Sequence, residues 1–198
     1  DLDHSGGKKQ LEKLISVDNV VNVKEKAKIY EEDWMKFLLL DYKGEDANEN
    51  SIVTYMQFYD TSILFMGDLG IKGEKELLKQ YPKLQADILK VGHHGSSTSS
   101  SSVFLHTLHP KLALISAGRN NRYQHPHQNV IENLHKENIH ELTTKEKGAV
   151  SIKICKYFYF YKTVEQEFGI ITTRRFSYRR LKLWRKTEIR IRYMITHR

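Results

Sequence analysis

The stretch Lys90-Val91-Gly92-His93-His94-Gly95-Ser96-Ser97-Thr98-Ser99 places two adjacent histidines directly after an apolar segment. Residues 86–91, which contain that segment, have the composition of a buried strand. Histidines at the end of a buried strand need either hydrogen-bond partners or a functional role. The flanking glycines allow the loop to turn back close to the strand. The stretch therefore predicts polar side chains held in place at a strand end.

Two other stretches show the same pattern of a β-like run, or the remnant of one, followed by polar residues and glycine. Residues 62–66 are apolar and lead into Gly67-Asp68, and the chain opens with Asp1-Leu2-Asp3-His4-Ser5-Gly6-Gly7. A strand end holds its side chains stiffly, and carboxylates with imidazoles are ligands that suit Zn²⁺ or Mn²⁺. The three stretches predict metal ligands that converge from distant parts of the chain. Taken singly, the two aspartate motifs also fit ordinary turns or helix caps.

The rest of the sequence predicts strands that alternate with helices. The clearest feature is a hairpin of residues 52–59 and 61–66, which are rich in β-branched and aromatic side chains. Further strands are expected at 19–23, 27–30, 34–42, 86–91, 112–116, 148–154 and 157–164, and helices at 9–15, 73–80, 103–108 and 129–136. This alternation predicts an α/β fold.

Composition limits the class of protein. A chain of 198 residues with 39% hydrophobic content can form one domain with a sizeable core. The single cysteine, Cys155, excludes an internal disulfide framework and a cysteine-rich metal site. No apolar run approaches the roughly 20 residues that span a bilayer, and no signal peptide is visible. Because the chain opens inside a motif and without Met, we expect it to be a fragment of a longer protein.

The positive charge is concentrated at the end of the chain. Residues 169–198 contain ten Lys and Arg residues and one acidic residue, whereas the other 168 residues contain 22 Lys and Arg against 23 Asp and Glu. We therefore divide the chain into a domain of residues 1–168 and a basic C-terminal tail of residues 169–198. The tail, with its interleaved aromatic residues, is a candidate for binding nucleic acid or an anionic membrane surface. The alternative is a solvated extension beyond the domain.

The three motifs together resemble successive metal motifs of the metallo-β-lactamase fold. In particular, they resemble the C-terminal domain of ComEC-type competence proteins, which are channel proteins of bacterial DNA uptake. Further similar segments are Asn50-Ser51-Ile52-Val53, Ser116-Ala117-Gly118, Asn121-Arg122-Tyr123-Gln124-His125-Pro126 and residues 143–150. The resemblance covers residues 1 to about 154. It implies an αββα sandwich, incomplete at its N-terminus, that carries one or two divalent ions on one edge.

The resemblance also implies a role for each motif residue. Asp1 would be a ligand of the first metal ion, and Asp3 and His4 would be ligands of the second. Asp68 would bridge the two ions. Either His93 or His94 would complete the second site, and the sequence does not decide between them.

The ligand set predicts a reaction. Two ions about 3.5–4 Å apart lower the pKa of a water molecule and hold a phosphodiester, and Asp3 would orient the resulting hydroxide. His125 is a candidate phosphate contact or general acid, with a surface histidine in a turn as the alternative. Tyr123, in the same loop, is a candidate substrate contact. Ser96 is a candidate for binding a phosphate oxygen, unless the serine run simply forms a mobile loop.

We therefore expect a metal-dependent hydrolase, a DNA phosphodiesterase or nuclease that acts in transformation. Its partners would be DNA, the upstream membrane-channel part of the same protein and other competence proteins. Its place would be the cell membrane, with this domain outside the cytoplasm. One alternative is a catalytically degenerate binding or structural module of the channel, because the family's third-motif histidine is replaced in the loop 48–51. Another is a hydrolase of a small substrate, since this fold supports many reactions.

Overall fold

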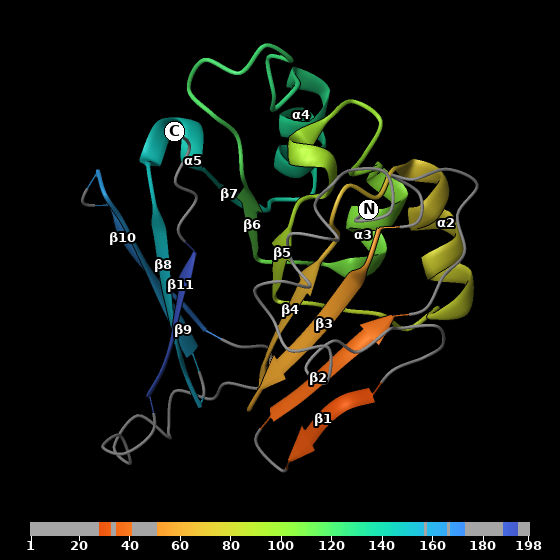
Figure 1. Cartoon of the computed structure of the whole chain (residues 1–198), viewed down its shortest axis with the longest axis vertical. Coiled ribbons are helices and arrows are strands. Elements are labelled where there is room, and N and C mark those ends of the chain that lie inside the picture. The colour runs from red at the N-terminus through yellow and green to blue at the C-terminus, as the bar shows by residue number, and fades with distance from the viewer. Residues whose placement is uncertain are drawn as a thin grey trace, which may run out of the picture.

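The chain forms two β-sheets and a set of helices, which confirms the α/β fold expected from the sequence (Figure 1). The computed structural model describes residues 28–32, 35–40, 51–156, 158–165, 167–172 and 188–193. The larger sheet has seven strands in the order β1-β2-β3-β4-β5-β6-β7, and the smaller has four in the order β10-β9-β8-β11. Of the helices in these ranges, none has the length and apolar character that crossing a membrane requires.

The larger sheet is antiparallel on one side and parallel on the other. Strands β1 to β4 pair antiparallel, and β4 to β7 pair parallel. The strands are β1 (Lys28–Glu32), β2 (Met35–Leu40), β3 (Val53–Phe58), β4 (Thr61–Phe65), β5 (Ile88–Lys90), β6 (Leu112–Ile115) and β7 (His140–Thr143). The expected hairpin is β3–β4. The sequence does not predict strand β7, because the strand has only four residues and most of them are polar.

Parallel neighbours need crossover connections, and each of the three contains a helix. The helices are α2 (Ile71–Gln80) before β5, α3 (Ser102–Leu108) before β6 and α4 (Gln128–Lys136) before β7. A short 3₁₀ turn at Gly92–Gly95 follows β5, and a single turn, α5 (Thr144–Lys147), follows β7. Each of the three crossover helices contains one of the predicted helical segments.

The smaller sheet is antiparallel and contains β8 (Val150–Cys155), β9 (Phe158–Thr163), β10 (Phe168–Thr172) and β11 (Glu188–Tyr193). Nearly all of β10 and the whole of β11 come from the range that we separated as a basic tail. Both strands are hydrogen-bonded to the sheet, β10 to β9 and β11 to β8. The division of the chain at residue 168 remains a prediction.

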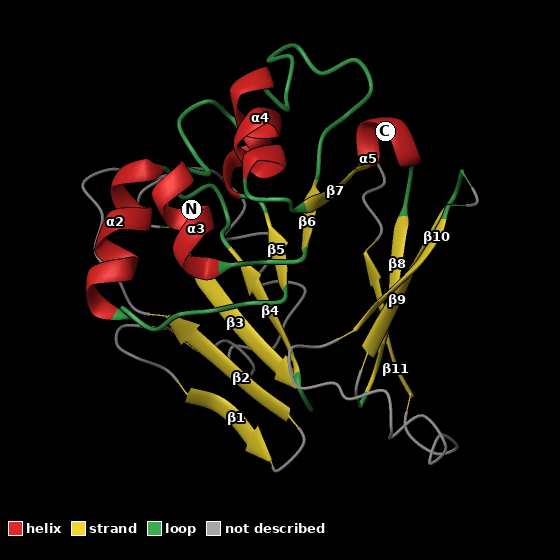
Figure 2. Cartoon of the chain, turned by 180° about the vertical axis from the view of Figure 1, so that it is seen from behind, coloured by secondary structure: helices red, strands yellow, loops and turns green. Residues whose placement is uncertain are grey.

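Strands β5 and β6 of the larger sheet are buried on both faces, and their neighbouring residues point in opposite directions into two different cores. Leu64, Leu89 and Ala113 belong to the core beneath α2, α3 and α4. The residues just before them, Ile63, Ile88 and Leu112, belong to a second core that packs against the smaller sheet. Figure 2 shows the resulting layers, with helices on one side of the large sheet and the small sheet on the other. The parallel strands are therefore held rigidly, and side chains at their ends are fixed in position.

Candidate functional site at the carboxyl ends of the parallel strands

The predicted site residues from the middle of the chain meet at the carboxyl ends of the parallel strands of the larger sheet. Asp68 follows β4, His93 and His94 follow β5, and Ser116 follows β6. These three strands are parallel neighbours, so their carboxyl ends lie side by side. In open α/β sheets this edge is where ligands bind.

Asp68 and His94 face each other at this edge. Oδ1 of Asp68 lies 3.6 Å from Nε2 of His94, and both side chains are about half exposed. Two ligand atoms about 2.1 Å from a tetrahedral metal ion would be separated by roughly 3.4 Å. The observed separation is therefore too long for a hydrogen bond but suits two atoms that share an ion.

The other ring nitrogen of His94 is held by a backbone carbonyl, which selects the tautomer of the neutral ring. Nδ1 lies 2.7 Å from the backbone carbonyl oxygen of Ser116. A carbonyl only accepts hydrogen bonds, so Nδ1 carries the proton and donates it. In the neutral ring Nε2 is then the nitrogen that carries the lone pair, and it is the one that lies 3.6 Å from Asp68. A histidine oriented in this way by a backbone carbonyl is typical of metal ligands.

His93 is placed differently from its neighbour. Its backbone N–H donates to the carbonyl of Gly67 at 3.0 Å, which joins the loop after β5 to the loop after β4. Its ring lies 6.0 Å from that of His125, edge to face. The structure thus brings His94 to Asp68 and directs His93 toward His125.

The backbone around the two histidines is unusual. Both have positive φ, 47° for His93 and 55° for His94. Non-glycine residues in this left-handed region cost of order 1–3 kcal/mol each and cluster at functional sites. The turn also requires glycine before it, because a Cβ on Gly92 would lie 2.7 Å from the carbonyl oxygen of Leu69. The chain therefore stores strain where it presents its histidines.

His125 is a buried histidine in the centre of the cluster, with only 8% of its surface exposed. Its ring stacks with Tyr123 and lies edge to face with His127, 4.8 Å away. Burial lowers the pKa of His125, the neighbouring histidines lower it further, and the charge of Asp68 opposes the shift. The ring is therefore neutral at neutral pH, and in that form it can accept a proton or donate a hydrogen bond.

The loop that carries His125 is built by Asn121. The Asn121 side chain donates to the carbonyls of Gly118 and His125, each at 2.8 Å, and accepts from the N–H of His125 at 2.7 Å. The loop is then docked on the turn after β5, because the N–H of His127 donates to the carbonyl of Gly95 and Nδ1 of His127 accepts from the N–H of Ser97. These contacts fix the position of His125 relative to His94.

The serine run after the histidines is held by a residue that sequence reasoning missed. The buried carboxylate of Glu74, on α2, accepts hydrogen bonds from the N–H of Ser100 and from both the N–H and hydroxyl of Ser101. The hydroxyl of Ser96 is engaged within the run, 3.1 Å from that of Thr98. In the sequence Glu74 looks like any acidic residue in the first turn of a helix.

Lys90 is a second residue that was missed. It ends β5 and is buried, with 7% of its surface exposed, and its ammonium donates to the carbonyl of Val91 at 2.7 Å. Burial lowers the pKa of Lys90, and the negative charge of Asp68 opposes that shift. The amino group of Lys90 therefore lies within electrostatic reach of Asp68. Its only signal in the sequence is a lysine inside an apolar strand.

The remaining predicted ligands, Asp1, Asp3 and His4, lie outside the described residues, as do positions 48–50 of the third-motif loop. Ser51 is described, and its hydroxyl accepts from the N–H of Asp68 at 3.0 Å. Within the described part of the chain, no three His, Cys, Asp or Glu side chains are arranged around a common metal position. These residues thus provide a pair, Asp68 and His94, rather than a complete ligand set.

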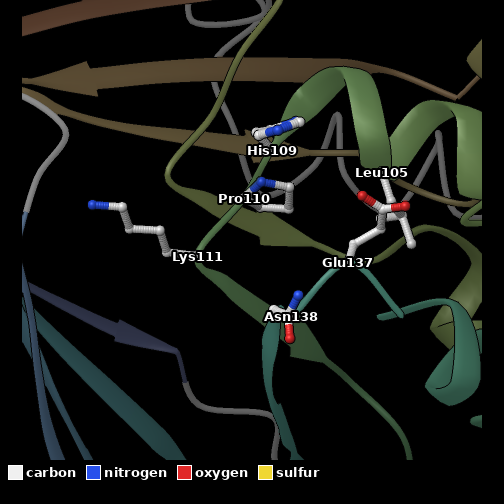
Figure 3. Close-up of a pocket in the computed structure, with 6 residues that line it drawn as sticks. All are labelled: Leu105, His109, Pro110, Lys111, Glu137 and Asn138. Carbon is white, nitrogen blue, oxygen red and sulfur yellow. The ribbon is translucent and has the colours of Figure 1, made fainter. Parts of the chain in front are cut away.

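A separate pocket of about 430 Å³ lies away from His93, His94 and His125 (Figure 3). Its residues precede β6 and β7 or end α3, so it lies toward the amino ends of the parallel strands. It is lined by Leu105, His109, Pro110, Lys111, Glu137 and Asn138. The pocket therefore lies at the opposite ends of the parallel strands from the candidate site.

Comparison with known proteins identifies competence proteins as relatives. The chain is 43% identical over 122 residues to ComE operon protein 3 of Bacillus subtilis (strain 168), a match that covers 60% of this chain and 16% of the relative. It is 38% identical over 109 residues to competence protein ComA of Neisseria gonorrhoeae, covering 54% of this chain and 16% of the relative. No family model matches the chain.

A third relative is recombination protein 2 of Haemophilus influenzae, 36% identical over 105 residues, which are 53% of this chain and 13% of that protein. Together these relatives confirm the resemblance to ComEC-type competence proteins. The matched region is only about a sixth or less of the length of each relative.

Proposed function

We propose that this chain is the hydrolase part of a ComEC-type DNA-uptake protein and cleaves the phosphodiester bonds of DNA with the help of one or two divalent metal ions. The observation that carries the proposal is the pairing of Asp68 with His94, whose second nitrogen is fixed by the carbonyl of Ser116. The names of the relatives support competence, and hence DNA, as the setting.

The proposed ligands are Asp68 and His94 together with Asp1, Asp3 and His4. A bound Zn²⁺ or Mn²⁺ would supply an acidified water and would neutralise charge on the phosphate. The chemistry of the pair fits such an ion, because both atoms are hard or borderline donors and no thiolate is present. Of the two adjacent histidines, we propose His94 as the ligand, since only its ring is directed at Asp68.

His125 would act beside the ligands as a proton carrier. Its lowered pKa keeps the ring neutral, and its ring contacts with His93, His94 and Tyr123 support this role. A neutral imidazole there can take a proton from the attacking water or donate a hydrogen bond to a phosphate oxygen. Asp3 remains the proposed residue for orienting the water.

We also propose the finer fold and the cellular setting. The fold would be the metallo-β-lactamase αββα sandwich, and the order helices, large sheet, small sheet supports it. The chain would act at the cell membrane, on the outer side, next to the channel part of the same protein and with other competence proteins. In this arrangement the hydrolase would meet DNA before or during its passage through the channel.

The proposal predicts that metal binding and DNA cleavage both depend on the Asp68–His94 pair. We expect Mn²⁺ or Zn²⁺ to raise the melting temperature of the full chain, since a metal that binds only the folded state stabilises it by mass action. Asp68→Asn and His94→Gln should weaken metal affinity by at least the roughly 10- to 100-fold that loss of an outer hydrogen-bond partner costs. Both variants should also abolish cleavage of linear DNA.

The matched control is His106→Gln, an exposed histidine on α3 whose ring pairs with Glu137. It should bind metal and cleave DNA as the unaltered chain does. Metal binding without cleavage of DNA or of small phosphodiesters would favour the alternative of a binding module of the channel. Equal cleavage by Asp68→Asn and the unaltered chain would overturn the proposed site.

A further inference from the structure

An exposed aromatic residue lies at the rim of the candidate site. Tyr123 is 57% exposed, and its ring stacks on the buried His125 with centroids 5.6 Å apart and planes 22° apart. The guanidinium carbon of Arg122 lies 4.6 Å from the centre of the same ring, and its Nη2 donates to the Tyr123 hydroxyl. A flat aromatic group and a flat cation are thus presented together beside the histidines.

The pair is held in place before any ligand arrives. Asn121 closes the loop from within, and the N–H of His127 ties the far side of the loop to Gly95. Pro126 packs tightly on Gly95, since a Cβ added to Gly95 would lie 2.7 Å from the Cβ of Pro126. A rigid platform loses little conformational entropy on binding, so its contacts contribute more of their strength to affinity.

The charge of Arg122 is available to an anion. The neighbouring Arg119 forms an ion pair with Glu165 at 3.2 Å. Within the described ranges, Arg122 contacts the ring and hydroxyl of Tyr123 and forms no ion pair with a carboxylate. A phosphate next to the platform would therefore meet a guanidinium without first displacing an acidic side chain.

From these observations we infer that Arg122 and Tyr123 bind a nucleotide of single-stranded DNA next to the cleavage site. An unpaired base stacks on the exposed ring or on the guanidinium plane, and the adjoining phosphate pairs with Arg122. Bases inside a duplex are already stacked on their neighbours and cannot use the platform. This inference rests on the proposed function for the choice of DNA as ligand, and it adds a preference for single strands.

The test is DNA binding by the full chain in EDTA, where cleavage does not occur. The probes are a 5′-fluorescein-labelled thymidine 20-mer and a labelled 20-base-pair duplex. Fluorescence anisotropy measures the affinity of the chain for each probe. Tyr123→Ala should weaken binding of the single strand by roughly 5- to 150-fold, the range for loss of one base–aromatic stack. Tyr123→Phe should retain most of the affinity because it keeps the ring. Arg122→Ala should weaken binding. It should also reduce the slope of log affinity against log salt concentration by about 1, the amount expected for loss of one phosphate contact.

The matched control is Phe168→Ala, which removes a ring that is 58% exposed on the smaller sheet. It should bind both probes as the unaltered chain does. Unchanged single-strand affinity in Tyr123→Ala, or an equal loss for the duplex, would overturn the inference. Thermal melts of each variant separate loss of binding from loss of folding. A chain that binds the single strand through Tyr123 but never cleaves DNA with Mn²⁺ would sink the nuclease proposal and leave this inference standing.

Discussion

At the scale of single residues, the site depends on contacts that no local pattern reveals. The sequence offers two adjacent histidines as equivalent candidates, and the carbonyl of Ser116, 22 residues from His94, distinguishes them. Lys90 is similar, since its charge matters only because folding buries it near Asp68. The residue types were readable in advance, but their orientations were not.

The lowered pKa of His125 predicts a pH dependence of stability. The unfolded chain takes up a proton on this residue near its ordinary pKa of about 6.5, whereas the folded chain resists protonation. The contribution of neutral His125 to the free energy of unfolding is therefore fully present above about pH 6.5 and is lost as the pH falls below that value. We expect urea melts between pH 7.5 and 5 to show a smaller loss of stability in His125→Asn than in the unaltered chain. His135→Gln, which removes an exposed histidine, is the control, and an equal slope in all three chains would contradict the assignment.

At the scale of elements, helix α2 supports the site through the serine run. The carboxylate of Glu74 accepts three hydrogen bonds from Ser100 and Ser101, and the Ser101 side chain accepts from the N–H of Phe104 at the start of α3. One buried acid thus joins α2, the loop after the histidines and α3. The helices themselves followed from apolar periodicity, whereas this junction did not.

We predict that Glu74→Gln destabilises the chain by about 2–4 kcal/mol, because an amide nitrogen would face backbone donors and leave buried groups unpaired. Glu76→Gln is a close control on the same helix, since that side chain forms only an exposed pair with Lys79 at 2.6 Å and should cost less than about 0.5 kcal/mol. Urea unfolding of the two variants measures the difference. Similar midpoints would mean that Glu74 does not hold the run.

At the scale of the whole molecule, residues 188–193 of the basic C-terminal range form a strand of the smaller sheet. Strand β11 pairs with β8 over the full register from Glu188 with Cys155 to Tyr193 with Val150. β8 in turn contributes Val150, Ile152 and Ile154 to the core between the sheets. Residues 188–193, within the range whose composition indicates a basic tail, therefore form the outer strand of the smaller sheet next to β8.

Truncation separates the two interpretations of this segment. Ending the chain after Thr172 removes β11 and leaves one edge of β8 unpaired, so we expect a lower melting temperature and increased aggregation. Ending it after Tyr193 keeps every described strand and should leave the melting temperature unchanged. An unchanged melting temperature in the chain that ends after Thr172 would show that the removed segment is only a solvated extension.

The sequence by itself determined the α/β class, the hairpin, three helices that alternate with strands and the polar motifs at strand ends. These features follow from short-range patterns, since alternation of apolar residues and nearby glycines act within a few residues. Only the tertiary structure decided which histidine faces Asp68, which acid anchors the serine run and which strand completes the smaller sheet. Each of these joins residues more than 20 positions apart. Such pairs form only when packing of the layers brings them together, so local patterning carries no trace of them.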